Sequence, residues 1–472
     1  MTYAFIFDAS FCSGCKACQA ACKDKNNLPV GVLWRRVIEV SGGAWQRADN
    51  AWTNSVFAYN LSIACNHCVH PKCAGVCPTD AYTIRADGVV VLDSSKCMGC
   101  GYCAWACPYG APQYNYEAGA MTKCDFCLDQ LELGLPPACV AACPMRVLDY
   151  GEAASDRGIA LWDVPAETHP FPLSTFSRTQ PRLAIQPHTA MSRTDGKAVA
   201  NFEEVQPRKP SAWEEVPLIL FTLLGQLAVG GFWAMSWLFP PLWTLTDRLA
   251  TPLRLIPHLV IGLALGPGLI ASFAHLGSKR NAWRVLTRLS HSWLSREILF
   301  ALVFGLGWLV TALADLFLQR GTGELASITA ILGIGLIYSM GQVYRLPAAP
   351  GWDSWRTNAG FFVSAILLGL SAMSPVLTYE SRLSGVPVPP IFWMFIGTSI
   401  LLALLGQLAL LQKRTSDIQA GNIRFWVIVS GGVLTMAGIF SPDGMNRLSW
   451  LIFLAVLAEE TLGRWLFYRS RL

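Results

Sequence analysis

The second half of this 472-residue sequence contains no cysteine. All sixteen cysteines lie between Cys12 and Cys143, and charged residues make up only 14% of the chain. The net charge of +5 is modest, and the basic residues cluster in loops between apolar runs, which argues against nucleic-acid binding. The sequence also has no Gly-rich nucleotide fingerprint and no recognisable catalytic triad. We therefore expect its chemistry to depend on the cysteines and on the apolar second half.

The cysteines form four clusters of four, and the spacing within each is typical of iron–sulfur ligands. The runs are C-x2-C-x2-C-x3-C (Cys12, Cys15, Cys18, Cys22), C-x2-C-x4-C-x3-C-P (Cys65, Cys68, Cys73, Cys77), C-x2-C-x2-C-x3-C-P (Cys97, Cys100, Cys103, Cys107) and C-x2-C-x11-C-x3-C-P (Cys124, Cys127, Cys139, Cys143). In bacterial ferredoxins such a run wraps three thiolates around one cluster, while the fourth reaches a second cluster. Sixteen ligands therefore predict four [4Fe–4S] clusters and a chain that conducts electrons.

Disulfides and zinc explain these cysteines less well. Residues 1–10 are too short and too interrupted, with Asp8 among them, to form a secretory signal peptide, so an oxidising compartment is not indicated. Zinc sites usually show paired C-x2-C knuckles without the C-x3-C-P ending. Iron–sulfur ligation is the favoured interpretation.

The order of the motifs predicts how the ligands are shared. If each fourth cysteine serves a partner cluster, the two middle motifs pair with each other, and so do the two outer motifs. The predicted ligand sets are Cys65, Cys68, Cys73 with Cys107; Cys97, Cys100, Cys103 with Cys77; Cys12, Cys15, Cys18 with Cys143; and Cys124, Cys127, Cys139 with Cys22. Two ferredoxin-like modules side by side would then string the clusters into a wire.

Eight apolar runs in the second half are long enough to cross a membrane as helices. They cover about 216–239, 252–276, 294–318, 324–343, 357–378, 388–411, 424–441 and 447–468. Trp and Tyr residues recur at their ends, including Trp293, Tyr344 and Trp355, as the interfacial regions of a bilayer favour.

The predicted fold class is an α+β, ferredoxin-like four-cluster domain over residues 1–165, followed by an all-α polytopic membrane domain of eight helices over residues 216–472. Residues 166–215 are rich in proline and lack periodicity, so we expect an irregular strap or linker there.

Histidine is scarce in the predicted spans: only His258 and His275 lie inside them, both on the second run. A b-type haem between helices normally needs two histidines on facing helices. These two lie about 25 Å apart along one helix, so they cannot share a haem. Electrons are then expected to pass directly between a cluster and a lipid-soluble carrier, for which menaquinone or ubiquinone is the best candidate.

A quinone site needs protonatable groups, and His275 and Glu297 are the candidates. His275 ends the second run and Glu297 opens the third, and ionisable residues at a membrane edge are costly enough to suggest function. The loop between them is basic, with Lys279, Arg280, Arg284 and Arg288. The simpler alternatives are a histidine bonded to a backbone carbonyl and a glutamate in a surface ion pair with a nearby arginine.

Two further ionisable residues on the last predicted helix favour a structural interpretation. Glu460 and Arg464 stand four residues apart, so they can form an ion pair on one helix face.

The charge of the loops predicts the membrane side of the N-terminal domain. Loops on its side carry twelve basic residues, which are Lys279, Arg280, Arg284, Arg288, Arg296, Arg345, Arg356, Lys413, Arg414, Arg424, Arg469 and Arg471. The opposite loops carry five, which are Arg248, Arg254, Arg320, Arg382 and Arg447. The positive-inside rule therefore predicts a multi-pass protein of the bacterial inner membrane with its iron–sulfur domain in the cytoplasm.

The cysteine-rich half resembles the iron–sulfur subunit of DMSO reductase over about residues 1–190. The resemblance is carried by FDASFCSGCKAC at 7–18, CNHC at 65–68 and CPYGAP at 107–112.

The apolar half resembles the DMSO reductase membrane anchor over about residues 215–470. HLGS at 275–278 and SREI at 295–298 are among the stretches that carry it. Members of this family usually have two chains where this protein has one.

The resemblance implies a separate molybdopterin catalytic subunit, since this chain shows no molybdopterin site of its own. It implies an eight-helix anchor without haem, with His275 and Glu297 in the quinol site. The chain would then carry the quinol or quinone half-reaction of an oxidoreductase and not the chemistry of the terminal substrate. DMSO reductases of this type face outward, against the charge rule. A cytoplasm-facing sulfite:quinone oxidoreductase, or a polysulfide or thiosulfate reductase, is the alternative.

Overall fold

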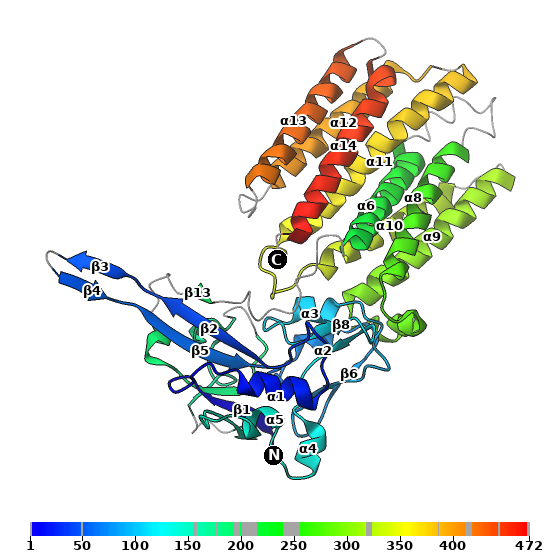
Figure 1. The fold of residues 1–472 in the computed structure, drawn as a ribbon. Helices are drawn as coiled ribbons and strands as arrows, with labels where there is room; N and C mark the ends of the chain where they lie inside the picture. The colour runs from blue at the N-terminus through cyan, green and yellow to red at the C-terminus, as the bar shows by residue number, and fades with distance from the viewer. Residues whose placement is uncertain are drawn as a thin grey trace. The chain divides into compact units, whose positions relative to one another are not determined.

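The computed structural model describes residues 2–48, 51–153, 158–174, 178–192, 199–200, 215–238, 255–317, 323–385, 387–410, 418–441 and 444–469. The chain divides into two compact units (Figure 1). The first contains Met1–Lys209, Leu276–Ser292 and Leu346–Ala349, and the second contains Pro210–His275, Trp293–Arg345 and Pro350–Leu472. Residues 175–177, 193–198 and 201–214 of the predicted strap, and the loop residues Arg248, Arg254, Arg320, Lys413, Arg414 and Arg471, lie outside the described residues.

A four-stranded sheet runs through the first unit in the order β10 (Leu148–Glu152), β1 (Tyr3–Asp8), β12 (Leu183–Gln186) and β11 (Ile159–Ala160). β1 is antiparallel to β10 and parallel to β12. Its Phe5 is buried and stacks on Phe126, with ring centroids 4.2 Å apart. β12 belongs to the segment that we expected to be irregular. That segment is not irregular throughout, because Leu183 and Ile185 are buried in register with β1.

The remaining strands of this unit form a second sheet and three hairpins. β2 (Arg36–Gly42) pairs with β5 (Phe57–Ile63) and with β13 (Val199–Ala200). The hairpins are β3 (Trp45–Ala48) with β4 (Ala51–Asn54), β6 (Tyr82–Ile84) with β7 (Val90–Leu92), and β8 (Gln113–Asn115) with β9 (Ala120–Thr122). The last two hairpins each follow the fourth cysteine of a middle motif and lead to the first cysteine of the next motif.

Five short helices lie in or beside the cysteine motifs. They are α1 (Ala17–Lys25), α2 (Lys72–Val76), α3 (Tyr102–Ala106), α4 (Leu128–Glu132) and α5 (Ala138–Ala141), with 3-10 turns at η1 (Ala166–Thr168) and η2 (Thr189–Ser192). The third cysteine of every motif is the second residue of a helix, namely Cys18, Cys73, Cys103 and Cys139. This repetition makes the first unit an α/β domain built around its cysteine motifs.

The second unit is helical. Its helices are α6 (Val216–Trp233), which continues as the π-helical η3 (Ala234–Leu238), α8 (Leu255–Ala274), α9 (Trp293–Phe317), α10 (Gly323–Val343), α11 (Trp355–Ser384), α12 (Pro390–Leu410), α13 (Ile418–Phe440) and α14 (Gly444–Arg469). Within the described residues, seven of these are long and apolar enough to cross a membrane, so the protein is membrane-integral. The prediction of eight spans is therefore confirmed in part. The helix outside this set is α14, whose Glu459, Glu460 and Arg464 lower its hydropathy.

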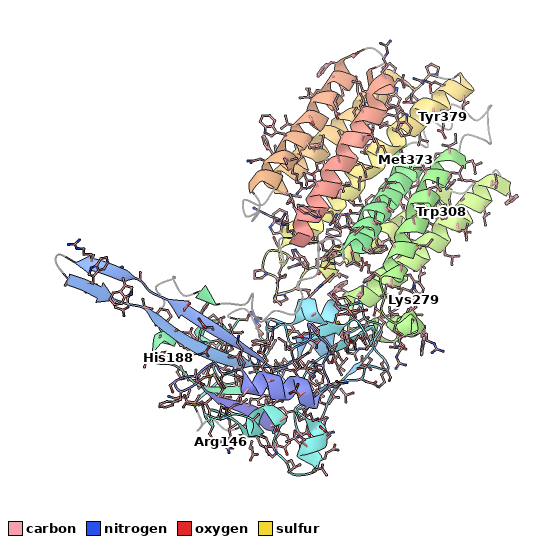
Figure 2. The ribbon with its side chains drawn as sticks, in the orientation of Figure 1. Arg146, His188, Lys279, Trp308, Met373 and Tyr379 are labelled. Carbon is pink, nitrogen blue, oxygen red and sulfur yellow. The ribbon has the colours of Figure 1, made fainter. Side chains whose placement is uncertain are left out.

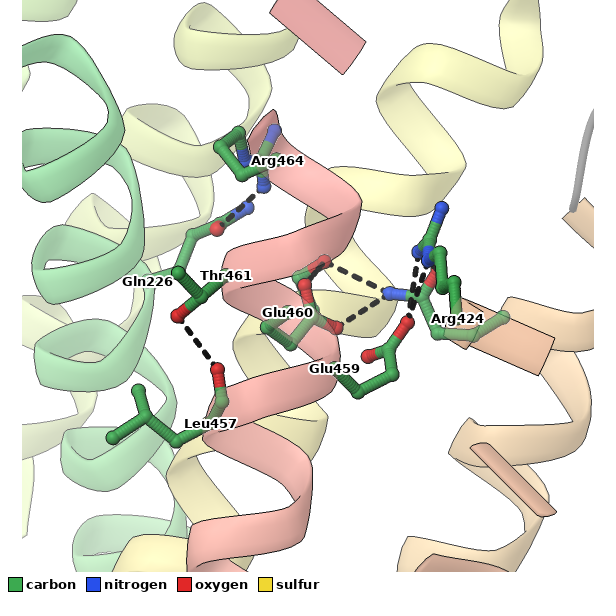
Figure 3. A network of polar contacts seen from close by, with 9 residues as sticks. Gln226, Arg424, Leu457, Glu459, Glu460, Thr461 and Arg464 are labelled. Atoms are coloured by element: carbon green, nitrogen blue, oxygen red, sulfur yellow. Dashed lines mark hydrogen bonds and ion pairs between the residues drawn. The ribbon is translucent and has the colours of Figure 1, made fainter. Parts of the chain in front are cut away.

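The polar side chains of α14 face other helices of the unit (Figure 3). Glu460 accepts hydrogen bonds from Ser364 of α11 (2.7 Å) and Gln407 of α12 (2.6 Å). Arg464 donates from Nη2 to Gln226 of α6 at 2.7 Å. The predicted Glu460–Arg464 ion pair does not form, because each side chain finds a partner on a neighbouring helix instead.

Glu459 completes this network through α13. Arg424 Nη2 and Nε lie 2.8 and 2.9 Å from Glu459 Oε1, and Arg424 also donates to Gln407 at 3.3 Å. Because hydrocarbon offers polar groups no other partner, such bonds fix how the helices pack.

Candidate iron–sulfur and quinone sites

The residue before the second cysteine of every motif has a left-handed backbone. These residues are Gly14, His67, Gly99 and Phe126, with φ of 70°, 42°, 73° and 69°. In this conformation Gly99 N–H donates to Cys97 Sγ at 3.3 Å, and Phe126 N–H donates to Cys124 Sγ at 3.4 Å. Glycine adopts the conformation without strain, whereas Phe126 is held there by its stacking on Phe5.

The Cys-Pro pairs also end in a repeated turn. Asp80, Gly110 and Arg146, each three residues after a fourth cysteine, have φ of 54°, 58° and 55° (Arg146 is marked in Figure 2). The next N–H groups point back: Ala81 donates to Cys77 Sγ at 3.4 Å, and Ala111 donates to Cys107 Sγ at 3.5 Å. N–H···S bonds of this kind stabilise thiolate ligands.

Two of the four predicted ligand sets surround cavities. One cavity is lined by Cys12, Cys15, Cys18 and Cys143, and the other by Cys65, Cys68, Cys73 and Cys107. Each set joins three cysteines of one motif to the fourth cysteine of a distant motif, as the exchange of fourth ligands predicts.

Members of the other two sets lie close enough to affect one another's pKa values. Burial raises the pKa of the Cys22 thiol to about 12, and the neighbouring Cys139 and Cys127 act in the same direction. Burial likewise raises the pKa of Cys100, and Cys77 and Cys97 beside it add to the effect. Buried thiols of this kind ionise when a metal replaces the proton.

The donor set fits clusters better than single ions. Among the described residues, no group of three or more His, Cys, Asp or Glu side chains is arranged to hold one metal ion. Four cysteines around a cavity are instead the ligand set of a [4Fe–4S] cluster.

Two buried cations, Arg35 and Lys123, support the same assignment. They are 1% and 3% exposed, and within the described part of the chain neither has an acidic ion-pair partner. Burying an unpaired charge is costly, and an anionic cluster would supply the opposite charge. Our sequence reasoning missed both residues. Lys123 directly precedes Cys124, which is a usable signal, but nothing local marks Arg35.

The connection between α8 and α9 belongs to the cysteine-containing unit. It contains the 3-10 segment η4 (Lys279–Arg288), and its Asn281 side chain donates to the carbonyl oxygens of Ser95 (2.8 Å) and Cys97 (2.9 Å). Ser278 N–H donates to Met98 O at 3.1 Å. The loop is thus fixed to the backbone around the first cysteine of the third motif.

The same connection also contacts the Cys77 turn. Ser292 Oγ donates to Val76 O at 2.9 Å, and Arg288 lies 3.3 Å from Asp80. Cys77 and Cys97 belong to one predicted ligand set, so the connection contacts two ligand loops of a single predicted cluster.

His275 and Glu297 lie at the same end of the α8–α9 hairpin. His258 Nε2 is 3.1 Å from Asp315 Oδ2 at the other end, and Trp308 packs on Gly262 between them (Figure 2). The two helices are therefore antiparallel, and a residue later in α8 lies beside a residue earlier in α9. Extending this register to the end of α8 brings His275 level with the turn of α9 that contains Glu297.

The two side chains differ in their partners. His275 Nδ1 lies 2.7 Å from Ser272 O. This contact is the bond to a backbone carbonyl that we considered as the simpler alternative. Glu297 is only 3% exposed and has no hydrogen-bond or ion-pair partner among the described residues, so the surface ion pair is not found. Tyr344 and Tyr468, which lie within electrostatic range of Glu297, hydrogen-bond to each other through their hydroxyl groups. Sequence reasoning missed this tyrosine pair because its members are 124 residues apart.

Comparisons with known proteins identify the relatives of the helical part. The sequence model of the family "DMSO reductase anchor subunit (DmsC)" matches residues 210–469, more than half of the chain. This protein belongs to that family. A second model, "4Fe-4S dicluster domain", matches residues 56–153, so this DMSO reductase anchor protein also contains an iron–sulfur domain.

Relatives of the cysteine-rich part are subunits of reductases and of a dehydrogenase. The sequence is 47% identical over 209 residues to the B subunit of the anaerobic dimethyl sulfoxide reductase of Escherichia coli (strain K12), a match that covers 43% of this protein and 98% of that subunit. It is 37% identical over 173 residues to the formate dehydrogenase iron-sulfur subunit of Wolinella succinogenes (32% and 82% covered). It is 40% identical over 150 residues to the thiosulfate reductase electron transfer subunit PhsB of Salmonella typhi (32% and 75% covered). The resemblance to a DMSO reductase iron–sulfur subunit fused to its anchor is confirmed.

Proposed function

We propose that this chain passes electrons between a lipid quinone, menaquinone or ubiquinone, and a separate molybdopterin catalytic subunit, through four [4Fe–4S] clusters. The observation that carries the proposal is that two of the four predicted cysteine sets line cavities, in a chain that also matches the DMSO reductase anchor family. When bound, the clusters supply one-electron transfer; the chain supplies their thiolates, the N–H···S bonds and two buried cations.

In this proposal the chain has three parts. Residues 1–165 form a ferredoxin-like four-cluster domain, 166–215 a strap, and 216–472 an anchor of eight spans. The eighth span is α14, whose charged side chains are bonded inside the helical unit and so need not meet lipid.

The cluster held by Cys97, Cys100, Cys103 and Cys77 is the one we assign to exchange with quinone. The connection that contacts its ligand loops is continuous with α8, and His275 stands three residues before Ser278, which bonds Met98.

His275 and Glu297 are proposed to bind the quinone head group and to move its protons. Glu297 is a buried acid without a hydrogen-bond partner among the described residues, as expected for a group that meets a ligand. No haem is invoked, because His258 is engaged by Asp315 at the far end of α8.

The membrane side follows from the loop charges. We propose the bacterial inner membrane with the iron–sulfur domain in the cytoplasm. A periplasmic reporter fused at Leu472 would be inactive in this arrangement, and an active fusion would exclude it.

The terminal reaction belongs to the partner. The anchor match favours a DMSO reductase-type complex, while the similarity to a thiosulfate reductase subunit keeps a polysulfide or thiosulfate reductase as the second candidate, beside a sulfite:quinone oxidoreductase. Purification of the complex followed by assay of DMSO, polysulfide, thiosulfate and sulfite decides between them.

Ligand substitution tests the electron path. Cys73→Ser and Cys139→Ser should each lose or alter one cluster in the EPR spectrum and stop quinol-coupled turnover, whereas the other three signals remain. Retention of all four signals in either variant would overturn the assignment of these ligands.

A further inference from the structure

Arg35 is held inside the cysteine-containing unit by contacts that involve only one of its three guanidinium nitrogens in hydrogen bonds within the described residues. Its Cζ lies 4.4 Å above the Phe5 ring, and Nη1 donates to Ser62 Oγ at 3.2 Å and to Ser62 O at 3.4 Å. Its Nε and Nη2 are buried without a hydrogen-bond partner among the described residues. A guanidinium has five donors, so this buried cation lacks an anion.

Arg35 lies between two of the cysteine sets. Ser62, which holds its side chain, lines the cavity of Cys12, Cys15, Cys18 and Cys143, and its Oγ lies 3.4 Å from Cys18 Sγ. On the other side, Arg35 lies near the Cys22 thiol, whose pKa it lowers against the stronger effect of burial. The cysteines on which its charge acts come from both sets, namely Cys139, Cys18, Cys124 and Cys22.

Lys123 stands at a different cavity. It is 3% exposed, lines the cavity of Cys65, Cys68, Cys73 and Cys107, and donates from Nζ to Cys124 O at 2.9 Å and to Val90 O. The two buried cations therefore face different pairs of motifs.

We propose that Arg35 is a positioning cation that raises the reduction potentials of the two clusters held by the outer motifs, while Lys123 does the same for the cluster of Cys65, Cys68, Cys73 and Cys107. A ligated cluster is anionic, and reduction adds a further negative charge. A desolvated cation beside it stabilises the reduced form more than the oxidised form. The proposal rests on the ligand sets of the proposed function.

Redox titration followed by EPR, on membranes that contain the full complex, tests this assignment. Arg35→Gln should move the midpoints of the two outer-motif clusters to more negative potentials and leave the other two unchanged. Arg35→Lys keeps the charge, so its midpoints should lie close to those of the unsubstituted chain. Lys123→Met should reverse the pattern, moving the Cys65 cluster and not the outer pair.

The outcomes separate this proposal from the ligand assignment. Equal shifts of all four midpoints in Arg35→Gln, or none, would overturn the role of Arg35. Absence of iron from the unsubstituted chain would instead overturn the proposed function.

If Arg35→Gln fails to assemble clusters, Ser62→Ala decides the matter. This substitution removes the Ser62 contacts with both Cys18 and Arg35. If only the Cys18 contact mattered, only the midpoint of the cluster held by Cys18 would shift. Because Arg35 is also released, we expect the midpoint of the cluster held by Cys22 to become more negative as well, and an unchanged Cys22 cluster would contradict the proposal.

Discussion

Buried charges are treated differently in the two units of this protein. In the helical unit, Arg424 pairs with Glu459 at 2.8 Å, and Arg464 and Glu460 each have a neutral polar partner on another helix. In the cysteine-containing unit, Arg35 and Lys123 are more deeply buried than Arg424, and neither has an acidic partner within the described residues.

The difference indicates what each unit is built to hold. Charges that bond one another, or a neutral polar side chain of a neighbouring helix, fix the packing of helices, since hydrocarbon offers them nothing else. Cations left without an acid, among cysteines arranged in sets of four, indicate an anionic guest. Substitutions in the helical network should therefore affect assembly, and substitutions near the cysteines should affect electron transfer.

The largest effect on stability is expected in the helical network. Glu460→Ala leaves Ser364 and Gln407 without their acceptor, and removing one member of a buried charged network costs about 3–5 kcal/mol. The detergent-solubilised variant should unfold at a clearly lower temperature. Thr461→Val is the control: among the described residues this exposed neighbour bonds only Leu457 O of its own helix, and a change within about 0.5 kcal/mol is expected. Equal melting temperatures for Glu460→Ala and the unsubstituted protein would contradict the packing role.

A smaller effect is expected where the α8–α9 connection packs on the rest of the cysteine-containing unit, to which it belongs. A Cβ at Gly277 would collide with Gly119 O and the Tyr114 hydroxyl, so Gly277→Ala must displace the loop at about 1–3 kcal/mol. Quinol-driven cluster reduction should slow while the EPR signals persist. Gly75→Ala, in the same unit and with open space around its Cβ, should leave the rate unchanged. A normal rate in Gly277→Ala would show that this contact does not serve electron transfer.

The smallest effect is expected at the rim of the same contact. Arg288 and Asp80 are 25% and 53% exposed, and exposed ion pairs contribute about 0–1 kcal/mol. Arg288→Ala should therefore reduce the thermal stability of the complex only slightly, and less at high salt. A loss as large as that of Gly277→Ala would mean that charge, and not backbone packing, holds the connection.

Local spacing made much of the structure predictable. A C-x2-C run closes within one left-handed turn, so the local shape of each motif follows from its spacing. The spans were placed within a few residues because apolar length is a local property: 294–318 was expected where α9 covers Trp293–Phe317. The largest difference is α11, expected over 357–378 but extending to Ser384, because Tyr379, Glu380 and Ser381 continue the helix despite their polarity.

Features that depend on tertiary packing were not predictable. Arg35 meets Ser62 and Cys139 only because distant strands and motifs fold together. The α8–α9 connection was expected as a basic loop, and nothing in its composition shows that Asn281 would bond the Cys97 backbone. The Glu460–Arg464 pair was inferred from helix spacing, which cannot reveal that Gln226 and Gln407 offer better-placed partners.

Quinol-driven reduction of the clusters tests the central claim most directly. In membranes holding the complete complex, a quinol analogue should reduce the clusters of the unsubstituted chain and of His291→Ala, whose exposed histidine lies outside the proposed site. In His275→Ala and Glu297→Gln the quinol should reduce them at least tenfold more slowly, while dithionite still reduces all of them. Reduction by quinol at the unsubstituted rate in both variants would contradict the assignment of the quinone site to this end of α8 and α9.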